Sequence, residues 1–273
     1  MSVTGLPFDD FRTLLRDLPG PDAQALVAAR ERDAQLTKPP GALGRLEEIA
    51  FWLAAWTGRP PAVTRPLVAI FAGNHGVTKQ GITPFPPSVT QQMVENFAAG
   101  GAAINQICVT YDLGLKVFDL ALDFPTADIT EEPALSERDC AATMAFGMEA
   151  IAGGTDLLCI GEMGIGNTTI AAAIHYALYG GKAEDWVGPG TGSEGEMLRR
   201  KIAASRRRSR CTALIFPIRW RSCVVSAVVR SPPWLAPFLR HAWSASRLSS
   251  TAMSQPLPPP SSRRPIHPRS IIA

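Results

Sequence analysis

Apolar residues along this chain first recur at helical spacing and later gather into short runs that are typical of buried strands. The helical pattern covers residues 8–18 and 22–36, which are separated by a Pro-Gly-Pro turn. A connector rich in proline and glycine, residues 37–47, leads into a third helix. We therefore predict a small helical subdomain over residues 1–60.

The pattern changes from residue 61 onward, where apolar runs alternate with helical segments. Strands that alternate with helices at this spacing form a parallel sheet with both faces covered. We therefore predict an α/β fold, a Rossmann-like parallel sheet covered by helices, in a nucleotide-binding domain over residues 61–204. Strands are expected at 67–72, 115–122 and 156–160, and helices at 88–108, 137–152, 170–178 and 194–204.

Glycine-rich loops follow two of these strands, at residues 73–76 and 161–166. Ligands of open parallel sheets bind beyond the carboxyl ends of the strands, where both loops are expected to lie. A third glycine cluster, residues 188–192, precedes the last predicted helix. The agreement between these positions is stronger evidence for a binding site than any one loop.

The loop at 161–166 ends in Asn167 and Thr168, which we interpret as N-cap residues of the next helix. A helix N-terminus offers unpaired N–H groups and the positive end of the helix dipole, so it suits a phosphate. Glu162, inside this loop, is a candidate proton acceptor. The spacing of Gly161, Gly164 and Gly166 matches neither the P-loop nor the dinucleotide fingerprint, so an ordinary tight turn stays an alternative.

The other candidate residues each have a plainer interpretation. Lys201 follows the cluster that holds Gly190 and Gly192, so it either binds a phosphate or ribose group or is a solvated helix lysine. His75 is a ligand contact, the proton partner of a leaving group, or a turn histidine bonded to nearby backbone.

The Pro-rich loop 83–87, with Thr83 and Pro84, forms either a wall of an apolar pocket for a flat aromatic ligand or an ordinary loop. His175 is expected to be structural. The sequence contains no His/Cys cluster at metal-ligand spacing, so it predicts no metal site.

Composition divides the chain sharply at Ser205. The last 69 residues contain 12 arginines and no lysine, aspartate, glutamate or glycine, whereas residues 1–204 carry a net charge of −9. Five unclustered cysteines and the absence of a signal peptide favour reduced thiols in a cytoplasmic protein. The sequence contains no run of 18 or more apolar residues, so it predicts no membrane span.

Four motifs, taken in order, resemble the nicotinate-nucleotide–dimethylbenzimidazole phosphoribosyltransferase family. They are Thr37-Lys38-Pro39-Pro40-Gly41-Ala42-Leu43-Gly44-Arg45-Leu46-Glu47, the Asn74-His75-Gly76-Val77 loop with the segments 81–83 and 86–90, the loop Gly161 to Thr169, and Gly188-Pro189-Gly190-Thr191-Gly192.

The resemblance covers residues 1–204 and implies transfer of phosphoribose from nicotinate mononucleotide to 5,6-dimethylbenzimidazole. The products are α-ribazole 5′-phosphate and nicotinate, in cobalamin biosynthesis. It further implies a homodimer, a small domain built from both chain ends, no cofactor, and neither a nucleic-acid nor a membrane partner.

The matching positions fall into three groups around the expected substrates. They are Glu162, Gly164, Gly166, Asn167 and Thr168 at the nucleotide, Gly190, Gly192 and Lys201 near the phosphate, and His75, Thr83 and Pro84 near the base. The family's usual catalytic glutamate lies in a Leu-Gly-Glu-Gly-Thr-Gly motif that the printed sequence does not contain. Glu162 is therefore the candidate base, and a catalytically silent relative that only binds nucleotide or benzimidazole is the alternative.

The tail at 205–273, rich in arginine, serine and proline, differs from what an α/β domain needs at its turns. A frame that begins at the third base of each codon permits a continuous alternative with glycines and acidic residues. We therefore predict an out-of-frame segment, with a disordered tail that binds nucleic acid or acidic partners as the alternative. The gene sequence beyond codon 204 distinguishes the two.

Overall fold

The computed structural model describes residues 8–9 and 19–207 of the 273-residue chain. Its first two complete helices are α2 (Ala23–Ala34) and α3 (Arg45–Thr57), which pack against each other. The Asp22 carboxylate caps α2 by accepting hydrogen bonds from two backbone N–H groups, and α3 ends at Gly58, whose φ is 64°. Both helices were predicted, whereas the helix expected at 8–18 lies largely outside the described residues.

The connector between α2 and α3 is held by half-buried ion pairs. Lys38 Nζ lies 3.0 Å from an Asp33 oxygen and 2.7 Å from Glu47 Oε1, and Glu47 also accepts the Leu43 N–H. These contacts tie both ends of the Pro-Pro-Gly segment to the helices that flank it. The connector is therefore an ordered loop.

The sheet has three parallel strands in the order β2-β1-β3. They are β1 (Pro66–Ala72), β2 (Gly114–Asp119) and β3 (Leu157–Met163), with β1 in the centre. The predicted parallel α/β architecture is confirmed. β3 runs past the predicted end at Ile160 and includes Gly161 and Glu162, which the sequence analysis placed in a loop, because both residues pair in register with β1.

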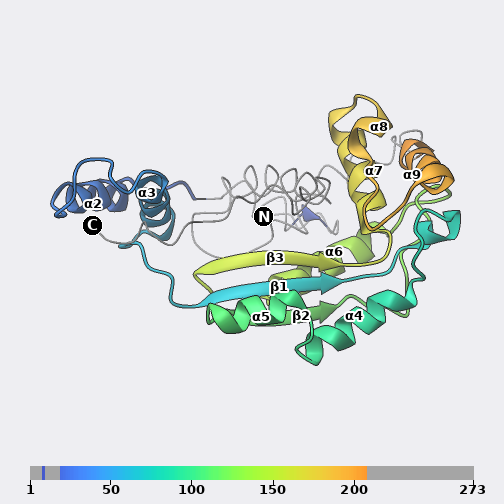
Figure 1. Ribbon diagram of the computed structural model, residues 1–273, viewed down its shortest axis with the longest axis horizontal. Coiled ribbons are helices and arrows are strands. Elements are labelled where there is room, and N and C mark those ends of the chain that lie inside the picture. The colour runs from blue at the N-terminus through green and yellow to red at the C-terminus, as the bar shows by residue number, and fades with distance from the viewer. Residues whose placement is uncertain (1–7, 10–18, 208–273) are drawn as a thin grey trace, which may run out of the picture.

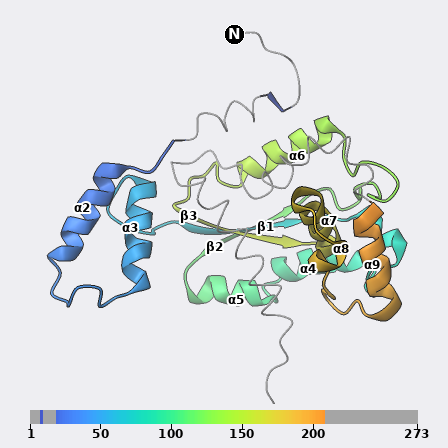
Figure 2. The same cartoon turned by 90° about the horizontal axis from the view of Figure 1, so that it is seen from above.

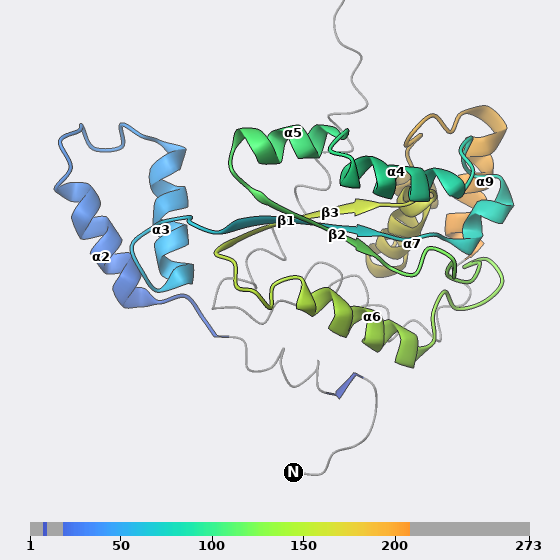
Figure 3. The ribbon, with the colours of Figure 1, turned by 90° about the horizontal axis from the view of Figure 1, so that it is seen from below.

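Helices cover both faces of the sheet, as Figure 3 shows. On one face lie α4 (Ser88–Ala98) and α5 (Ala103–Thr110), where Val68 and Ile70 pack against Cys108. On the other lies α6 (Glu137–Glu149), and Ala69 and Leu158 form a core that extends to Trp56 of α3. Alternate residues of β1 therefore serve two separate cores, as the period of a strand requires.

The single helix predicted over 88–108 is wrong, because the structure has two helices there. Gly100 adopts φ 79°, a left-handed conformation that ends α4. The Asn105 carboxamide then accepts the Ala102 N–H and donates to the Phe97 carbonyl, which fixes the start of α5.

Three helices lie beyond the carboxyl ends of the strands, to which the arrowheads point in Figure 1. They are α7 (Asn167–Tyr179), the short α8 (Ala183–Trp186) and α9 (Gly195–Arg207), and Figure 2 shows them from above at the end opposite α2 and α3. A 3₁₀ turn, η1 (Gly76–Gln80), follows β1 and contacts α9. Neither α8 nor η1 was predicted.

The break expected at Ser205 does not coincide with the end of a structural element. α9 continues to Arg207, and Ser205 is fully buried with its hydroxyl 3.5 Å from the Thr169 carbonyl. The out-of-frame prediction otherwise concerns residues 208–273, which lie outside the described part of the chain, and it stays a prediction.

A buried carboxylate joins β3 to the segment before β1 at the amino ends of the strands. Asp156 accepts hydrogen bonds from the Thr64 N–H and hydroxyl, both at 2.7 Å, and from the Arg65 N–H at 2.9 Å, and pairs with Arg59. Burial alone would raise the pKa of this carboxyl, but these donors lower it to about 2. Asp156 is thus a fully satisfied anion.

Candidate functional site

The glycine-rich loops meet at the carboxyl edge of the sheet. The Gly73 N–H donates to the Met163 carbonyl at 3.0 Å, which ties the loop after β1 to the end of β3. The Ser193 hydroxyl donates to the Ile82 carbonyl at 2.8 Å, which ties the third glycine cluster to the segment before α4. Hydrogen bonds therefore bring together, next to α7, segments that are far apart in the sequence.

α7 begins at this region, but not with the predicted cap. Its N-cap is Gly166, with φ 96° and no side-chain cap bond, while Asn167 and Thr168 are the first two helical residues. The N-cap interpretation of these two is wrong, because their side chains contact other groups. Gly166 permits the left-handed turn, and a Cβ there would lie 3.2 Å from Thr78 Cγ2 of η1.

His75 contacts the head of α7. Its Nε2 is hydrogen-bonded to Asn167 Oδ1, and its Nδ1 lies 3.4 Å from the Thr126 hydroxyl. Burial lowers the pKa of His75, and the bond to Asn167 opposes this only in part, so the ring is neutral near pH 7. The structure thus brings together two predicted site residues, His75 and Asn167.

The backbone around His75 is closely packed. The Gly76 N–H donates to the Thr126 carbonyl at 2.8 Å, and the Thr126 N–H donates to the Asn74 carbonyl at 3.0 Å. A Cβ at Gly76 would lie 2.6 Å from the Thr126 oxygen and 2.7 Å from the Asp128 nitrogen, so only glycine fits. Thr126 was missed in the sequence because it lies in an irregular loop with no pattern of its own.

Lys201 of α9 is the largest fully buried side chain in the described part of the chain, at 2% exposure. Its Nζ donates to Thr168 Oγ1 at 2.9 Å and to the Gly188 carbonyl at 2.8 Å. No carboxylate among the described residues pairs with it, and burial lowers its pKa to about 8. Lys201 is therefore a buried ammonium with neutral partners only, and the solvated-lysine alternative is wrong.

Gly190 lies against this ammonium. Its φ is 57°, and a Cβ there would lie 3.1 Å from both Lys201 Nζ and Thr168 Oγ1. Gly192 has φ 110° and open space around it. The structure therefore joins Gly190, Thr168 and Lys201, while Gly192 shapes the same turn without contacting them.

Glu162 is the penultimate residue of β3 and alternates in phase with Leu158 and Ile160, whose side chains lie on the face covered by α6. Among the described residues it has no hydrogen-bond or ion-pair partner. Its side chain reaches solvent, yet the surrounding protein desolvates the carboxyl enough to raise its pKa. A carboxylate with a raised pKa is suited to accept a proton.

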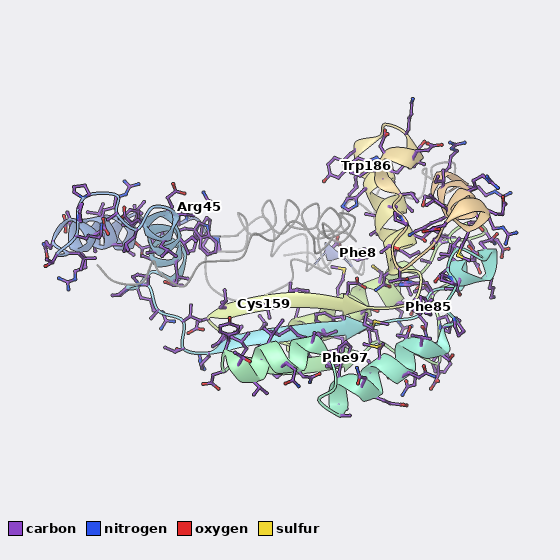
Figure 4. All side chains as sticks on the ribbon, in the orientation of Figure 1. Phe8, Arg45, Phe85, Phe97, Cys159 and Trp186 are labelled. Atoms are coloured by element: carbon purple, nitrogen blue, oxygen red, sulfur yellow. The ribbon has the colours of Figure 1, made fainter. Side chains whose placement is uncertain are left out.

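Thr83 and Pro84 lie in the segment between η1 and α4. Thr83 is half-buried and its hydroxyl accepts the Phe85 N–H at 3.3 Å, while Pro84 is exposed. Figure 4 shows Phe85 at the end of the sheet where α9 lies and Cys159 farther back on β3. No hydrogen bond among the described residues joins Thr83 to His75 or Lys201.

The described residues include no group of three or more potential metal ligands, and none of their helices has the length and apolar character of a membrane span.

Gly164 is placed by packing: a Cβ there would lie 2.5 Å from Asn167 Oδ1 and also meet the Gly73 carbonyl. The site is thus one of hydrogen-bond donors, a buried cation and one carboxylate.

Comparison with known proteins gives this arrangement a context. The model of a family described as phosphoribosyltransferase matches residues 18–216. The chain belongs to this family. A buried ammonium beside a helix N-terminus is consistent with a substrate that carries phosphate.

Relatives of high identity share most of the chain. The nicotinate-nucleotide–dimethylbenzimidazole phosphoribosyltransferase of Rhizobium rhizogenes is 96% identical over 204 residues, which are 75% of this chain and 60% of that protein. The protein of the same name from Sinorhizobium fredii is 89% identical over 207 residues, 76% of this chain and 61% of that protein. The chain thus spans about 60% of the length of these curated relatives.

Solved structures share the fold. A crystal structure of CobT from Thermus thermophilus superposes with a TM-score of 0.65 at 42% identity, and covers 69% of this chain and 62% of that one. A crystal structure of nicotinate-nucleotide–dimethylbenzimidazole phosphoribosyltransferase from the same organism gives 0.62 at 40% identity, over 68% and 61%.

Proposed function

We propose that this protein transfers phosphoribose from nicotinate mononucleotide to 5,6-dimethylbenzimidazole and releases α-ribazole 5′-phosphate and nicotinate. The names of its relatives and its membership in the phosphoribosyltransferase family support this reaction. The substrates need a site that binds a phosphate and a proton acceptor for an azole N–H. The described residues supply a candidate for each.

One observation carries the proposal, the buried ammonium of Lys201. A buried charge without a partner of opposite charge is costly, and a bound group of opposite sign can compensate it. Lys201 lies against the second residue of α7, at the positive end of the helix dipole, which adds to the need for an anion. The substrate phosphate supplies that anion.

The proposed reaction exchanges one N-glycosidic bond for another. A ring nitrogen of dimethylbenzimidazole attacks the anomeric carbon with its lone pair, and the pair of the breaking bond returns to the pyridine nitrogen of nicotinate. Attack from the face opposite the leaving group inverts the anomeric carbon. The N–H proton of the benzimidazole must then pass to a base.

Glu162 is our candidate for that base. Desolvation raises its pKa and strengthens it as a proton acceptor, and it lies at the end of the strand that leads into α7. We propose that the benzimidazole is contacted by Thr83, Pro84 and His75. The nucleotide is contacted in this proposal by Gly164, Gly166, Asn167, Thr168, Gly190 and Gly192.

The finer assignments are also proposals. We place the protein in the cytoplasm on the grounds of its free cysteines, and we expect the homodimer of its family. We keep the division into a helical subdomain over residues 1–60 and a nucleotide-binding domain over 61–204. No cofactor or metal takes part.

A binding and turnover assay on the 273-residue chain tests the function. The chain would be titrated with nicotinate mononucleotide by calorimetry and then incubated with dimethylbenzimidazole, and nicotinate and α-ribazole phosphate would be quantified by chromatography. We expect nucleotide binding that inorganic phosphate competes away. Because the Leu-Gly-Glu-Gly-Thr-Gly motif is absent from the printed sequence, we expect turnover far below that of the Rhizobium rhizogenes relative.

Each other outcome has a clear meaning. Turnover that equals the relative's would show that Glu162 suffices as the base. Binding without product would favour the catalytically silent alternative. A folded chain that binds no nucleotide would overturn the proposed site.

A further inference from the structure

His75 lies between two polar groups and is tied to both. Its Nε2 is bonded to Asn167 Oδ1, and its Nδ1 is 3.4 Å from the Thr126 hydroxyl. A carbonyl oxygen only accepts, so Nε2 carries the proton of a neutral imidazole. In that tautomer Nδ1 is unprotonated and can accept from the Thr126 hydroxyl, which lies 3.4 Å away.

Asn167 needs an external group to fix its carboxamide. The N-cap of α7 is a glycine without a side chain, so the Asn167 amide is not used in capping. A free carboxamide can rotate by half a turn and exchange oxygen for nitrogen at the same place. Oxygen would repel a bound anion, whereas the NH₂ group would donate to it.

Gly164 brings the same carboxamide close to the loop. A side chain at Gly164 would collide with Asn167 Oδ1 and Cγ, at 2.5 and 2.9 Å from the added Cβ. The oxygen of Asn167 therefore has a defined place between His75 and Gly164. Nδ2 has no acceptor among the described residues and stays available to a ligand.

We propose that His75 is a positioning residue that acts through Asn167: its Nε2–H selects the rotamer in which Asn167 offers Nδ2 to the substrate phosphate. The Thr126 hydroxyl, 3.4 Å from Nδ1, can donate to this nitrogen and so accommodates the tautomer with the proton on Nε2. Burial lowers the pKa of the imidazole and keeps it neutral, so no positive charge interferes with the selection. The inference deepens the proposed function and rests on it for the identity of the anion.

Two amide substitutions separate this role from a purely structural one. The Nε2 of a glutamine reaches about as far from the backbone as the Nε2 of histidine, while the Nδ2 of asparagine reaches only to the Nδ1 position. His75→Gln therefore keeps the donor to Asn167, and His75→Asn keeps only the neighbourhood of Thr126. Calorimetry with nicotinate mononucleotide should show affinity within about threefold of the parent for His75→Gln and a loss of about tenfold for His75→Asn.

A double-mutant cycle tests whether His75 acts through Asn167. In an Asn167→Ala background, His75→Asn should cause no further loss of affinity. A second loss of about tenfold there would mean that His75 contacts the ligand itself and would overturn the inference. Equal losses for His75→Gln and His75→Asn in the parent background would overturn it as well.

A spectroscopic measurement on the parent chain keeps the inference independent of the function. Long-range ¹H–¹⁵N correlation of the His75 ring reports which nitrogen carries the proton. A proton on Nε2 supports the inference even if nicotinate mononucleotide does not bind, in which case the proposed function alone fails. A proton on Nδ1 overturns the inference whatever binds.

Discussion

Two buried charges lie at opposite ends of the same three-stranded sheet, and their surroundings differ. Asp156, at the amino ends of the strands, accepts three hydrogen bonds from Thr64 and Arg65 and pairs with Arg59. Lys201, at the carboxyl ends, has a hydroxyl and a carbonyl as partners and no carboxylate among the described residues.

The pKa values record the difference. Hydrogen bonds outweigh burial at Asp156 and lower its pKa to about 2, which favours the charged form. Burial alone acts at Lys201 and lowers its pKa to about 8, which disfavours the charged form. A compensated charge stabilises the fold, while an uncompensated one needs another reason to be kept. The contrast supports our proposal that Asp156 serves the structure and Lys201 binds the substrate phosphate.

The sharpest test of this contrast removes the cation. Lys201→Met should weaken nicotinate mononucleotide binding by about 100-fold, because a charge-assisted contact of about 2–3 kcal/mol is lost. The free energy of unfolding should not fall, because an apolar side chain replaces a desolvated charge. Calorimetry and denaturant unfolding measure the two effects, and Lys182→Met, at the exposed residue just before α8, is the matched control. A loss of stability without a loss of affinity would reverse the assignment.

Removal of the Asp156 charge should lower stability and leave nucleotide affinity unchanged, which is the opposite of the result expected for Lys201→Met. Asp156→Asn should lower the free energy of unfolding by about 1–3 kcal/mol, because donors from Thr64, Arg65 and Arg59 lose a charged acceptor. Nucleotide affinity of the folded protein should not change. Urea unfolding followed by calorimetry checks both, and a weaker affinity at full folding would show that the two ends of the sheet are coupled.

A backbone substitution tests the geometry of the α7 head. Gly166→Ala should cost about 1–2 kcal/mol of stability, since its φ of 96° is strained for alanine and the new Cβ would press on Thr78. Gly153→Ala, where the added Cβ meets nothing, should be close to neutral. Thermal unfolding of the pair gives the comparison, and equal melting temperatures would contradict it.

The smallest predicted effect is the dependence on pH. Lys201 is charged below pH 8 and neutral above it, so affinity for nicotinate mononucleotide should fall by about tenfold from pH 7 to pH 9. The free energy of unfolding should change in the other direction. The unfolded lysine keeps its proton up to its ordinary pKa near 10.5, whereas the folded one loses it near pH 8. Lys201 therefore raises the free energy of unfolding as the pH rises from about 8 to 10.5. Titrations at both pH values, repeated with Lys201→Met, isolate the contribution, and a profile unchanged by the substitution would exclude Lys201.

Much of the fold could be predicted because apolar periodicity marks strands and helices directly. The three strands and the parallel order of the α/β segment follow from runs such as Leu67–Ala72. The break between α4 and α5 was missed because Gly100 and Gly101 lie inside a continuous helical pattern. Only the left-handed conformation of Gly100 shows where the chain turns.

The site could be predicted in its residue types and not in its contacts. Glycine loops at strand ends indicated Asn167, Thr168 and Lys201, but periodicity cannot show that Lys201 is buried without a carboxylate. The contact between His75 and Asn167 joins residues 92 positions apart, and no local pattern reports it. Glu162 was placed in a loop because glycine suggested a turn, whereas pairing with β1 extends the strand through it.

The main chain at Gly76 presses directly on the main chain at 126–128, with no side chain between them. Two loops in such contact cannot slide past each other without breaking the hydrogen bonds that Gly76 and Thr126 exchange with their neighbours. The two loops should therefore move as one rigid unit, and their amide protons should exchange with solvent together. Pro84 and Phe85 are instead exposed on a separate loop, whose amide protons we expect to exchange independently of this pair.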